Sequence, residues 1–276
     1  MSNVSDTACW AALYRALESK RRDALFKDPF AERLAGEKGK EIAAHAPRLV
    51  RNGWPVIART VLIDRYVQAA IAEGCDCVLN LAAGFDMRPY RLALPASLTW
   101  IEADLPALIE EKQSVLAGLK PSCLLTRQKA DLANAAERAA FLDEALRRKS
   151  KALVISEGLL MYLSEDNVRS LSHDLMRPQV AWWVLETLSP MVREAIMKSM
   201  RSELTNAPML FAPPDGIAFF ERLGWKVLDV HSILHEALRL RRLPFLLSVA
   251  ARLPLPQPDP RNVAKARWSA IVRLGR

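Results

Sequence analysis

Short apolar runs of strand length recur along most of the chain and alternate with segments whose apolar residues follow helical spacing. The runs lie at residues 78–81, 98–101, 123–130, 152–155, 179–186, 225–230 and 268–274. Helical spacing appears between most of them, at residues 106–117, 135–148, 164–176 and 191–203. Strands that alternate with helices indicate a parallel sheet with helices on both faces. We therefore predict an α/β fold with a seven-stranded, mostly parallel sheet.

Helical patterns also precede the first strand. They predict helices at residues 5–20, 29–35 and 56–72, whereas residues 37–55 show no pattern and stay unassigned. The short helix is expected to end at Gly36, because glycine commonly terminates helices. We interpret residues 1–276 as a single domain in which residues 1–74 form a helical cap.

The turn after the first strand carries candidate chemistry. Residues 82–86 read AAGFD, and the second strand ends in the acids Glu102 and Asp104. Small residues let a ligand approach the backbone, and an acid at the end of the next strand can accept hydrogen bonds from both ribose hydroxyls. The GxGxxG pattern is missing, and Asp86 would repel a diphosphate but attract a cation. The turn therefore favours a positively charged adenosine ligand, such as S-adenosylmethionine, over NAD. The alternative is an ordinary turn with solvated acids.

Several strands end in a polar or glycine position. These positions are Gly84, Asp86, Asp104, Asp131 and Glu157. Because ligands bind beyond the carboxyl ends of parallel strands, we expect them to converge on one crevice.

Composition and charge narrow the class of protein. The chain is 51% hydrophobic and 25% charged, which is typical of a folded soluble protein, and no apolar run approaches the roughly 20 residues of a membrane span. No secretory signal is visible, so we expect a cytoplasmic protein whose four cysteines are reduced thiols. The net charge of +8 is spread along the chain and not interleaved with aromatics. This disfavours nucleic acid as a partner and is consistent with an anionic substrate. Nothing in the sequence indicates the oligomeric state.

Five segments resemble a known family. They are ESKRRDALFKDPFAERLAG (18–36), ARTVLID (58–64), NLAAGFDMRPYRL (80–92), EADLP (102–106) and SEGLLMYL (156–163). On these motifs the chain resembles the leucine carboxyl methyltransferase-like family of class I S-adenosylmethionine-dependent methyltransferases. That family includes phosphatase-methylating eukaryotic enzymes and bacterial polyketide carboxyl O-methyltransferases. The resemblance implies a Rossmann-like sheet of seven strands with the last strand antiparallel, S-adenosyl-L-methionine as cofactor and methyltransferase activity.

The resemblance also implies site residues. Cofactor-binding roles fall on Lys20, Arg21, Arg59, Ala82, Ala83, Gly84, Asp86, Asp104, Asp131, Leu132 and Glu157. Arg59 would hold the methionine carboxylate, Asp86 would face its amino group and Asp104 would bind the ribose. Asp131 and the amide of Leu132 would bind the adenine.

Other matched positions carry further implications. Glu157 would lie at the methionine amino end or the substrate entrance, and Tyr162 would line the acceptor pocket. The family has glycine at the position of Ala82 and threonine at that of Met87. The methyl group of Ala82 would narrow the cofactor turn. Arg88 is a further candidate for the acceptor pocket, although it could instead brace the turn through an ion pair.

The cofactor chemistry bears on the acceptor. A sulfonium is already a strong electrophile, so a carboxylate acceptor needs only alignment and shielding from water. A phenol or alcohol would require a base, and none of the four histidines lies in a recognisable catalytic motif. We therefore expect a carboxylate of a small molecule or peptide as acceptor, and no metal.

Two alternative functions, and the role of one segment, stay open. The protein could be an NAD-type Rossmann dehydrogenase, or an S-adenosylmethionine-binding protein without catalytic activity. Residues 231–262 are amphipathic and rich in proline, as expected of a lid, a partner-binding segment or a membrane-surface element. We favour a lid-like insertion over the acceptor site.

Overall fold

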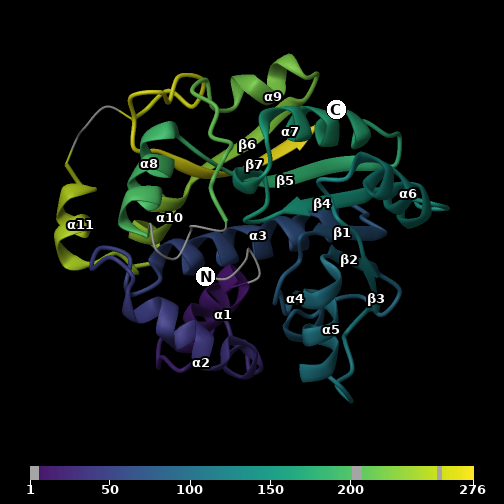
Figure 1. Cartoon of the computed structure of the whole chain (residues 1–276), viewed down its shortest axis with the longest axis horizontal. Coiled ribbons are helices and arrows are strands. Elements are labelled where there is room, and N and C mark those ends of the chain that lie inside the picture. The colour runs from purple at the N-terminus through teal and green to yellow at the C-terminus, as the bar shows by residue number, and fades with distance from the viewer. Residues whose placement is uncertain (1–5, 201–206, 254–256) are drawn as a thin grey trace.

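The structure of the protein is a computed structural model that describes residues 6–200, 207–253 and 257–276. Its centre is a seven-stranded sheet in the order β3-β2-β1-β4-β5-β7-β6 (Figure 1). The strands are β1 (Cys77–Leu81), β2 (Thr99–Asp104), β3 (Leu124–Lys129), β4 (Ala152–Ser156), β5 (Val180–Leu188), β6 (Lys226–Ser232) and β7 (Ser269–Gly275). β7 pairs antiparallel with β5 and β6, and the other neighbouring strands pair in parallel. The predicted fold, with its antiparallel last strand, is confirmed.

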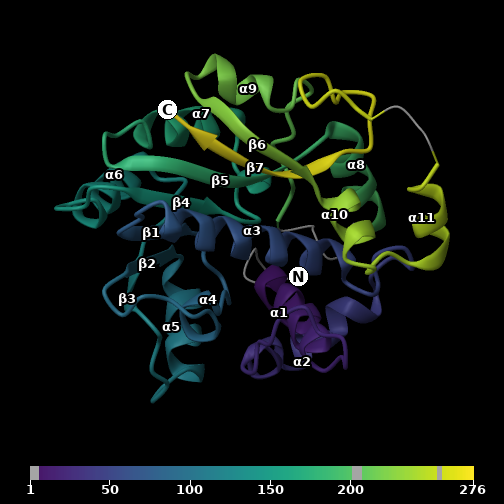
Figure 2. The ribbon, with the colours of Figure 1, turned by 180° about the vertical axis from the view of Figure 1, so that it is seen from behind.

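Helices cover both faces of the sheet because the central strands are apolar on both sides. Every residue of β1 and β4 is buried. On one face, alternate strand residues pack against α6 (Ala135–Ala145), α7 (Glu165–Asp174) and α9 (Ala218–Arg222). On the other face they pack against α3 (Trp54–Ala72) and α10 (Ile233–Arg239), and Figure 2 shows α3 crossing in front of the sheet.

The N-terminal helices pack beside the turn that follows β1. α1 (Asp6–Ser19) and α2 (Ala31–Ala44) share an apolar cluster with α5 (Pro106–Val115). Phe85 and Met87, which follow β1 directly, are buried in the same cluster. This packing holds one side of α1 against the site described below.

α2 extends further than its sequence predicted. Gly36 has φ 55° and ψ −163°, so the helix kinks there, but it resumes and continues to Ala44. It resumes because tertiary contacts hold its second half: a Cβ on Gly39 would lie 2.7 Å from the carbonyl oxygen of Cys9 in α1, and Ile42 is buried. The first helical segment therefore ends at Gly36 as predicted, and the sequence did not predict the second segment, which continues to Ala44.

Four further helices complete the described chain. They are α4 (Arg88–Arg91), the 3-10 helix η1 (Leu160–Tyr162), α8 (Pro190–Ser199) and α11 (Phe245–Ala250). α4, η1 and α11 were not predicted, because each is too short for a helical period to appear. The helix expected at residues 191–203 corresponds to α8, and residues 201–203 lie outside the described residues. No helix in the described ranges has the length and apolar character needed to pass through a bilayer.

Candidate functional site

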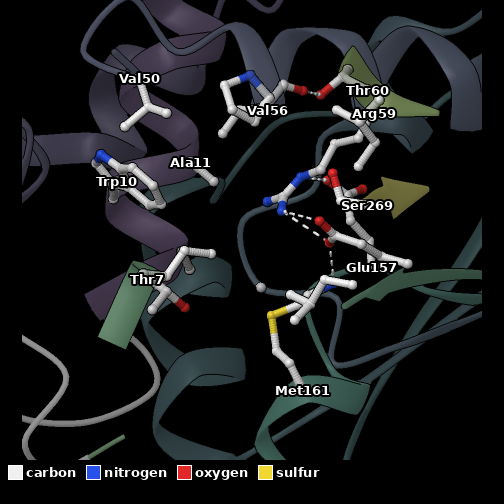
Figure 3. A pocket seen from close by; sticks show the side chains of 18 of the residues that line it. Thr7, Trp10, Ala11, Val50, Val56, Arg59, Thr60, Glu157, Met161 and Ser269 are labelled. Atoms are coloured by element: carbon white, nitrogen blue, oxygen red, sulfur yellow. Dashed lines mark hydrogen bonds and ion pairs between the residues drawn. The ribbon is translucent and has the colours of Figure 1, made fainter. Parts of the chain in front are cut away.

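A cavity of about 570 Å³ lies beyond the carboxyl ends of β1, β2, β4 and β5 (Figure 3). The predicted site residues that line it are Arg59, Ala82, Ala83, Gly84, Asp86, Arg88, Asp104, Glu157 and Tyr162. Arg59 comes from α3, Arg88 from α4 and Tyr162 from η1, and the others lie at or just after the ends of β1, β2 and β4. The packing of the sheet therefore produces the crevice that the strand-end pattern predicted.

The turn after β1 meets the carboxylate at the end of β2. The Gly84 amide donates a 2.7 Å hydrogen bond to Asp104 Oδ2, and the Leu105 amide donates a 2.8 Å hydrogen bond to Oδ1. Gly84 has a φ of 48°, and a Cβ there would lie 3.3 Å from the Cβ of Ala8 in α1. Burial raises the pKa of Asp104 and outweighs the opposing effect of the two amides. Since a carboxylate has about four acceptor sites, Asp104 keeps capacity for ligand hydroxyls.

Ala82 adopts the left-handed backbone conformation that glycine favours. Its φ is 52°. This conformation costs an L-alanine roughly 1–2 kcal/mol, because its Cβ approaches the following carbonyl oxygen. The turn therefore has a backbone conformation that suits glycine, and Ala82 adopts it at a cost in conformational energy.

Ala82→Gly should raise the free energy of unfolding by about 0.5–1 kcal/mol, because the relief of strain exceeds the added freedom of the unfolded chain. It should also tighten the binding of S-adenosylmethionine, since the methyl group leaves the cavity wall. The control is Arg148→Gly, at an exposed position with φ 59° that does not line the cavity. Arg148→Gly should raise the free energy of unfolding and leave the affinity for S-adenosylmethionine unchanged. Urea unfolding and titration calorimetry measure the two effects, and a less stable Ala82→Gly protein would contradict the strain argument.

Arg88 joins three carboxylates in a buried network. Its Nε lies 2.7 Å from Asp64, and its Nη1 lies 2.6 Å from Asp86 and 3.0 Å from Glu157. Its side chain is only 2% exposed. Arg91 donates two more hydrogen bonds to Asp64, each of 2.7 Å. The sequence left two roles open for Arg88, contact with the acceptor or an ion pair that braces the turn. These contacts engage it in the second role.

Arg59 extends this network to β5. Its Nε lies 2.9 Å from Glu157, and its Nη1 donates to both oxygens of Glu186 at 3.1 and 2.9 Å. Burial works to lower the pKa of Arg59, but the charges of Glu186 and Glu157 outweigh burial and raise it. Among the described residues, no acceptor pairs with Nη2 of Arg59. That nitrogen is available to a ligand.

The network has more negative than positive charge. Three arginines face four carboxylates: Arg59, Arg88, Arg91, Asp64, Asp86, Glu157 and Glu186. Asp104 lies on the same cavity wall. Around the turn after β1 and the ends of β4 and β5, this local excess of negative charge favours the cationic groups of a ligand.

Four residues predicted to bind the cofactor do not line this cavity. Lys20 and Arg21 are exposed and form ion pairs with nearby acids. Asp131 is exposed and accepts a hydrogen bond within its own loop. The side chain of Leu132 is buried in the core beneath the sheet. Asp131 therefore does not join the other strand-end positions, and the cofactor roles of these four residues stay predictions.

Other cavity residues were missed from the sequence. α1 places Thr7, Ala11 and Arg15 on one face at four-residue spacing. Figure 3 shows Thr7 and Ala11 on this side of the cavity, with Trp10 beside them. The helical spacing of α1 was visible, but nothing in it indicated a cavity. Glu186 was recognisable, because it ends the predicted fifth strand as the other acids end theirs.

Away from the acids the cavity is apolar. Its walls there include Trp10, Val50, Trp54, Val56, Met161, Ile196, Met200 and Leu247. Tyr162 packs against this part and also interacts with Arg59. Burial raises the pKa of Tyr162 to about 12, so its hydroxyl is protonated at neutral pH and can donate a hydrogen bond. In the part of the chain that the structure describes, no group of three or more side chains could hold a metal.

Similar proteins were found by sequence. Residues 8–176 match the family model described as leucine carboxyl methyltransferase. A Mycobacteroides abscessus protein, described as a putative S-adenosyl-L-methionine-dependent methyltransferase, is 37% identical over 63% of this chain and 61% of its own length. A Frankia alni protein with that description is 29% identical, and the match covers 93% of this chain and 91% of that protein. The match thus spans less than two thirds of the Mycobacteroides relative.

Solved structures share the fold. A putative methyltransferase from Thermobifida fusca has a TM-score of 0.56 at 17% identity, over 96% of this chain and 94% of that one. A DUF574 family protein from Streptomyces avermitilis has a TM-score of 0.59 at 11% identity, over 96% of both chains. Because the family model matches more than half of the residues, this chain belongs to the leucine carboxyl methyltransferase family, as its sequence motifs predicted.

Proposed function

We propose that this protein transfers a methyl group from S-adenosyl-L-methionine to a carboxylate oxygen of a small molecule or of a peptide C-terminus. A polyketide or another secondary metabolite is the small molecule that the sequence motifs suggest. The observation that carries the proposal is the cavity, in which a net negative network at the strand ends meets an apolar compartment. Family membership and the descriptions of the relatives support the choice of methyl donor.

The residues of the cavity fit a cationic nucleoside. Asp104 has acceptor capacity for ribose hydroxyls, and Nη2 of Arg59 can donate to a carboxylate. The surplus of negative charge suits a sulfonium and an ammonium group. Asp86 already accepts hydrogen bonds from Asn80 and Arg88, so it would act on the ammonium group mainly through its charge.

The chain's own residues have to orient an acceptor and exclude water. When bound, the cofactor supplies a methyl group on a sulfonium, which is electrophilic without help from the protein. The apolar walls exclude water, and the protonated hydroxyl of Tyr162 can donate to an acceptor oxygen and align it. A carboxylate is ionised at neutral pH, so no general base is needed.

The alternatives differ in what they require of the cavity. A phenol or alcohol acceptor would need a base, and no histidine lies among the described residues of the cavity wall. A dinucleotide would bring a diphosphate to a turn that contains Asp86 and lacks the glycine pattern. A binding protein without transferase activity is the remaining alternative, and the strained Ala82 is the feature that favours it.

The segment of residues 231–262 borders the proposed acceptor compartment. Its residues Ser232, Ile233, Leu234 and Leu247 line the cavity. We expect the segment to cover the acceptor and to contribute to its selection.

Mass spectrometry can identify the product. The protein, S-adenosylmethionine with a labelled methyl group and a metabolite or protein extract should yield a labelled methyl ester. EDTA should leave the rate unchanged, because alignment and not a metal promotes the transfer. Calorimetry should detect binding of S-adenosylmethionine but not of NAD. Labelled ethers, or a rate that EDTA abolishes and a divalent ion restores, would contradict the proposal. Binding without product from any extract would favour the inactive alternative.

A further inference from the structure

A second cavity adjoins the first. It has a volume of about 720 Å³ and lies between β6, α10, α11 and the start of β7. Ser232, Leu234, Leu247 and Arg267 line both cavities. In Figures 1 and 2, α11 lies at the edge of the molecule, next to α8 and α10 and away from the sheet. These four shared side chains are therefore a boundary between two adjoining spaces.

The polar groups of the second cavity are mostly cationic. Arg65 and Arg239 are both paired with Glu236, at 2.7 Å each, so this acid is neutralised. Arg267 makes no hydrogen bond or ion pair to any other described residue and is exposed. His231 and His235 add ring nitrogens to the wall. The cavity therefore presents positive charge that no acid of the described chain balances.

The rest of the second cavity is apolar. Val230, Leu253 and Trp268 line it together with Ala250 and Ala251. An anionic group on a hydrocarbon chain would complement both kinds of wall, because the chain would cover the apolar side chains and the anion would pair with arginine.

Building on the proposed function, we propose that the acceptor is an elongated acid with two anionic ends. Its reactive carboxylate lies in the first cavity, its hydrocarbon chain passes Leu234 and Leu247, and its second anionic group pairs with Arg267 in the second cavity. Arg267 precedes Ser269 by two residues, and Figure 3 shows Ser269 beside Arg59 in the first cavity. One chain segment thus contributes to both ends of the path. The second cavity selects acceptors by length and by their distal charge.

Titration calorimetry on the protein saturated with S-adenosylhomocysteine, which fills the cofactor site but cannot donate a methyl group, tests this inference. The probes are monocarboxylic acids of rising chain length and α,ω-dicarboxylic acids of matched length. Each added CH₂ should tighten binding up to about fourfold until the path is filled. A long dicarboxylic acid should bind about tenfold more tightly than the matched monocarboxylic acid, since its second anion gains a charge-assisted hydrogen bond.

Two variants locate the effect. Arg267→Gln should abolish the preference for the long dicarboxylic acid, whereas Arg267→Lys should keep part of it. Lys265→Gln is the control, because Lys265 is exposed two residues away and lines neither cavity. Ala250→Trp fills the second cavity alone, and should weaken long acids while short acids bind as before.

The outcomes separate this inference from the proposed function. If short acids bind but neither length nor a second carboxylate improves affinity, or if Arg267→Gln keeps the preference, the inference is overturned and the proposed function stands. If S-adenosylhomocysteine binds but acids of every length fail to bind to the saturated protein, the carboxylate acceptor is wrong, and the inference fails with it.

Discussion

Arg88→Met should lower the free energy of unfolding by about 3–5 kcal/mol, because it leaves buried carboxylates without their shared cation. Asp64, Asp86 and Glu157 all pair with Arg88, whose side chain is 2% exposed. Methionine keeps an apolar chain in place of the aliphatic stem of arginine and lacks the guanidinium, so the loss reports mainly the missing charge and its hydrogen bonds. Urea unfolding at neutral pH gives the value.

The loss should shrink as the pH is lowered toward 4. In the natural protein, burial works to raise the pKa of Asp86, but the charges of Arg88, Lys112 and Arg91 outweigh burial and hold it below its usual value. The stability that ionised Asp86 supplies is present above its unfolded pKa of about 3.9 and is lost as the pH falls through the lower folded value. Without Arg88, the buried acids should have raised pKa values, so that taking up protons at mildly acidic pH restores stability to the variant.

Arg147→Met is the matched control. Arg147 pairs with Glu144 on the surface, where its side chain is 67% exposed. An exposed pair contributes less than about 1 kcal/mol, so this variant should unfold almost like the natural protein. Equal stability losses in the two variants would show that the Arg88 network does not hold the turn.

Asp104→Asn should weaken the binding of S-adenosylmethionine by about tenfold to a hundredfold, because a charged acceptor of two ribose hydroxyls becomes a neutral amide. The carboxylate of Asp104 accepts the amides of Gly84 and Leu105, and asparagine can keep one of these bonds through its oxygen. The fold should therefore persist. Calorimetry measures the affinity, and thermal unfolding checks that the variant is folded.

Glu110→Gln supplies the comparison for Asp104→Asn. Glu110 lies on α5, is exposed and pairs with Lys129 away from the cavity. Glu110→Gln should leave the dissociation constant for S-adenosylmethionine unchanged. A folded Asp104→Asn protein with the affinity of the natural chain would mean that Asp104 does not bind the ribose.

Local patterns predicted individual site residues better than their roles. Gly84, Asp104 and Glu157 were identified because each follows an apolar run, and all three line the cavity. Asp131 had the same signal, yet its loop lies outside the cavity and its side chain accepts a hydrogen bond locally. A strand end places a residue at the correct edge of the sheet, but the direction of the side chain depends on the following loop.

Sequence alone determined the order of strands and helices along the chain and the family, because apolar periodicity and short motifs are properties of neighbouring residues. The antiparallel last strand was expected only from the resemblance to that family. Only the tertiary structure decided which charges meet. Arg59 and Glu186 are 127 residues apart, and Arg88 and Glu157 are 69 apart. Such pairs form only when α3, the turn after β1 and the ends of β4 and β5 are packed at one edge of the sheet. No local pattern in the sequence shows that residues so far apart along the chain lie in contact in the fold.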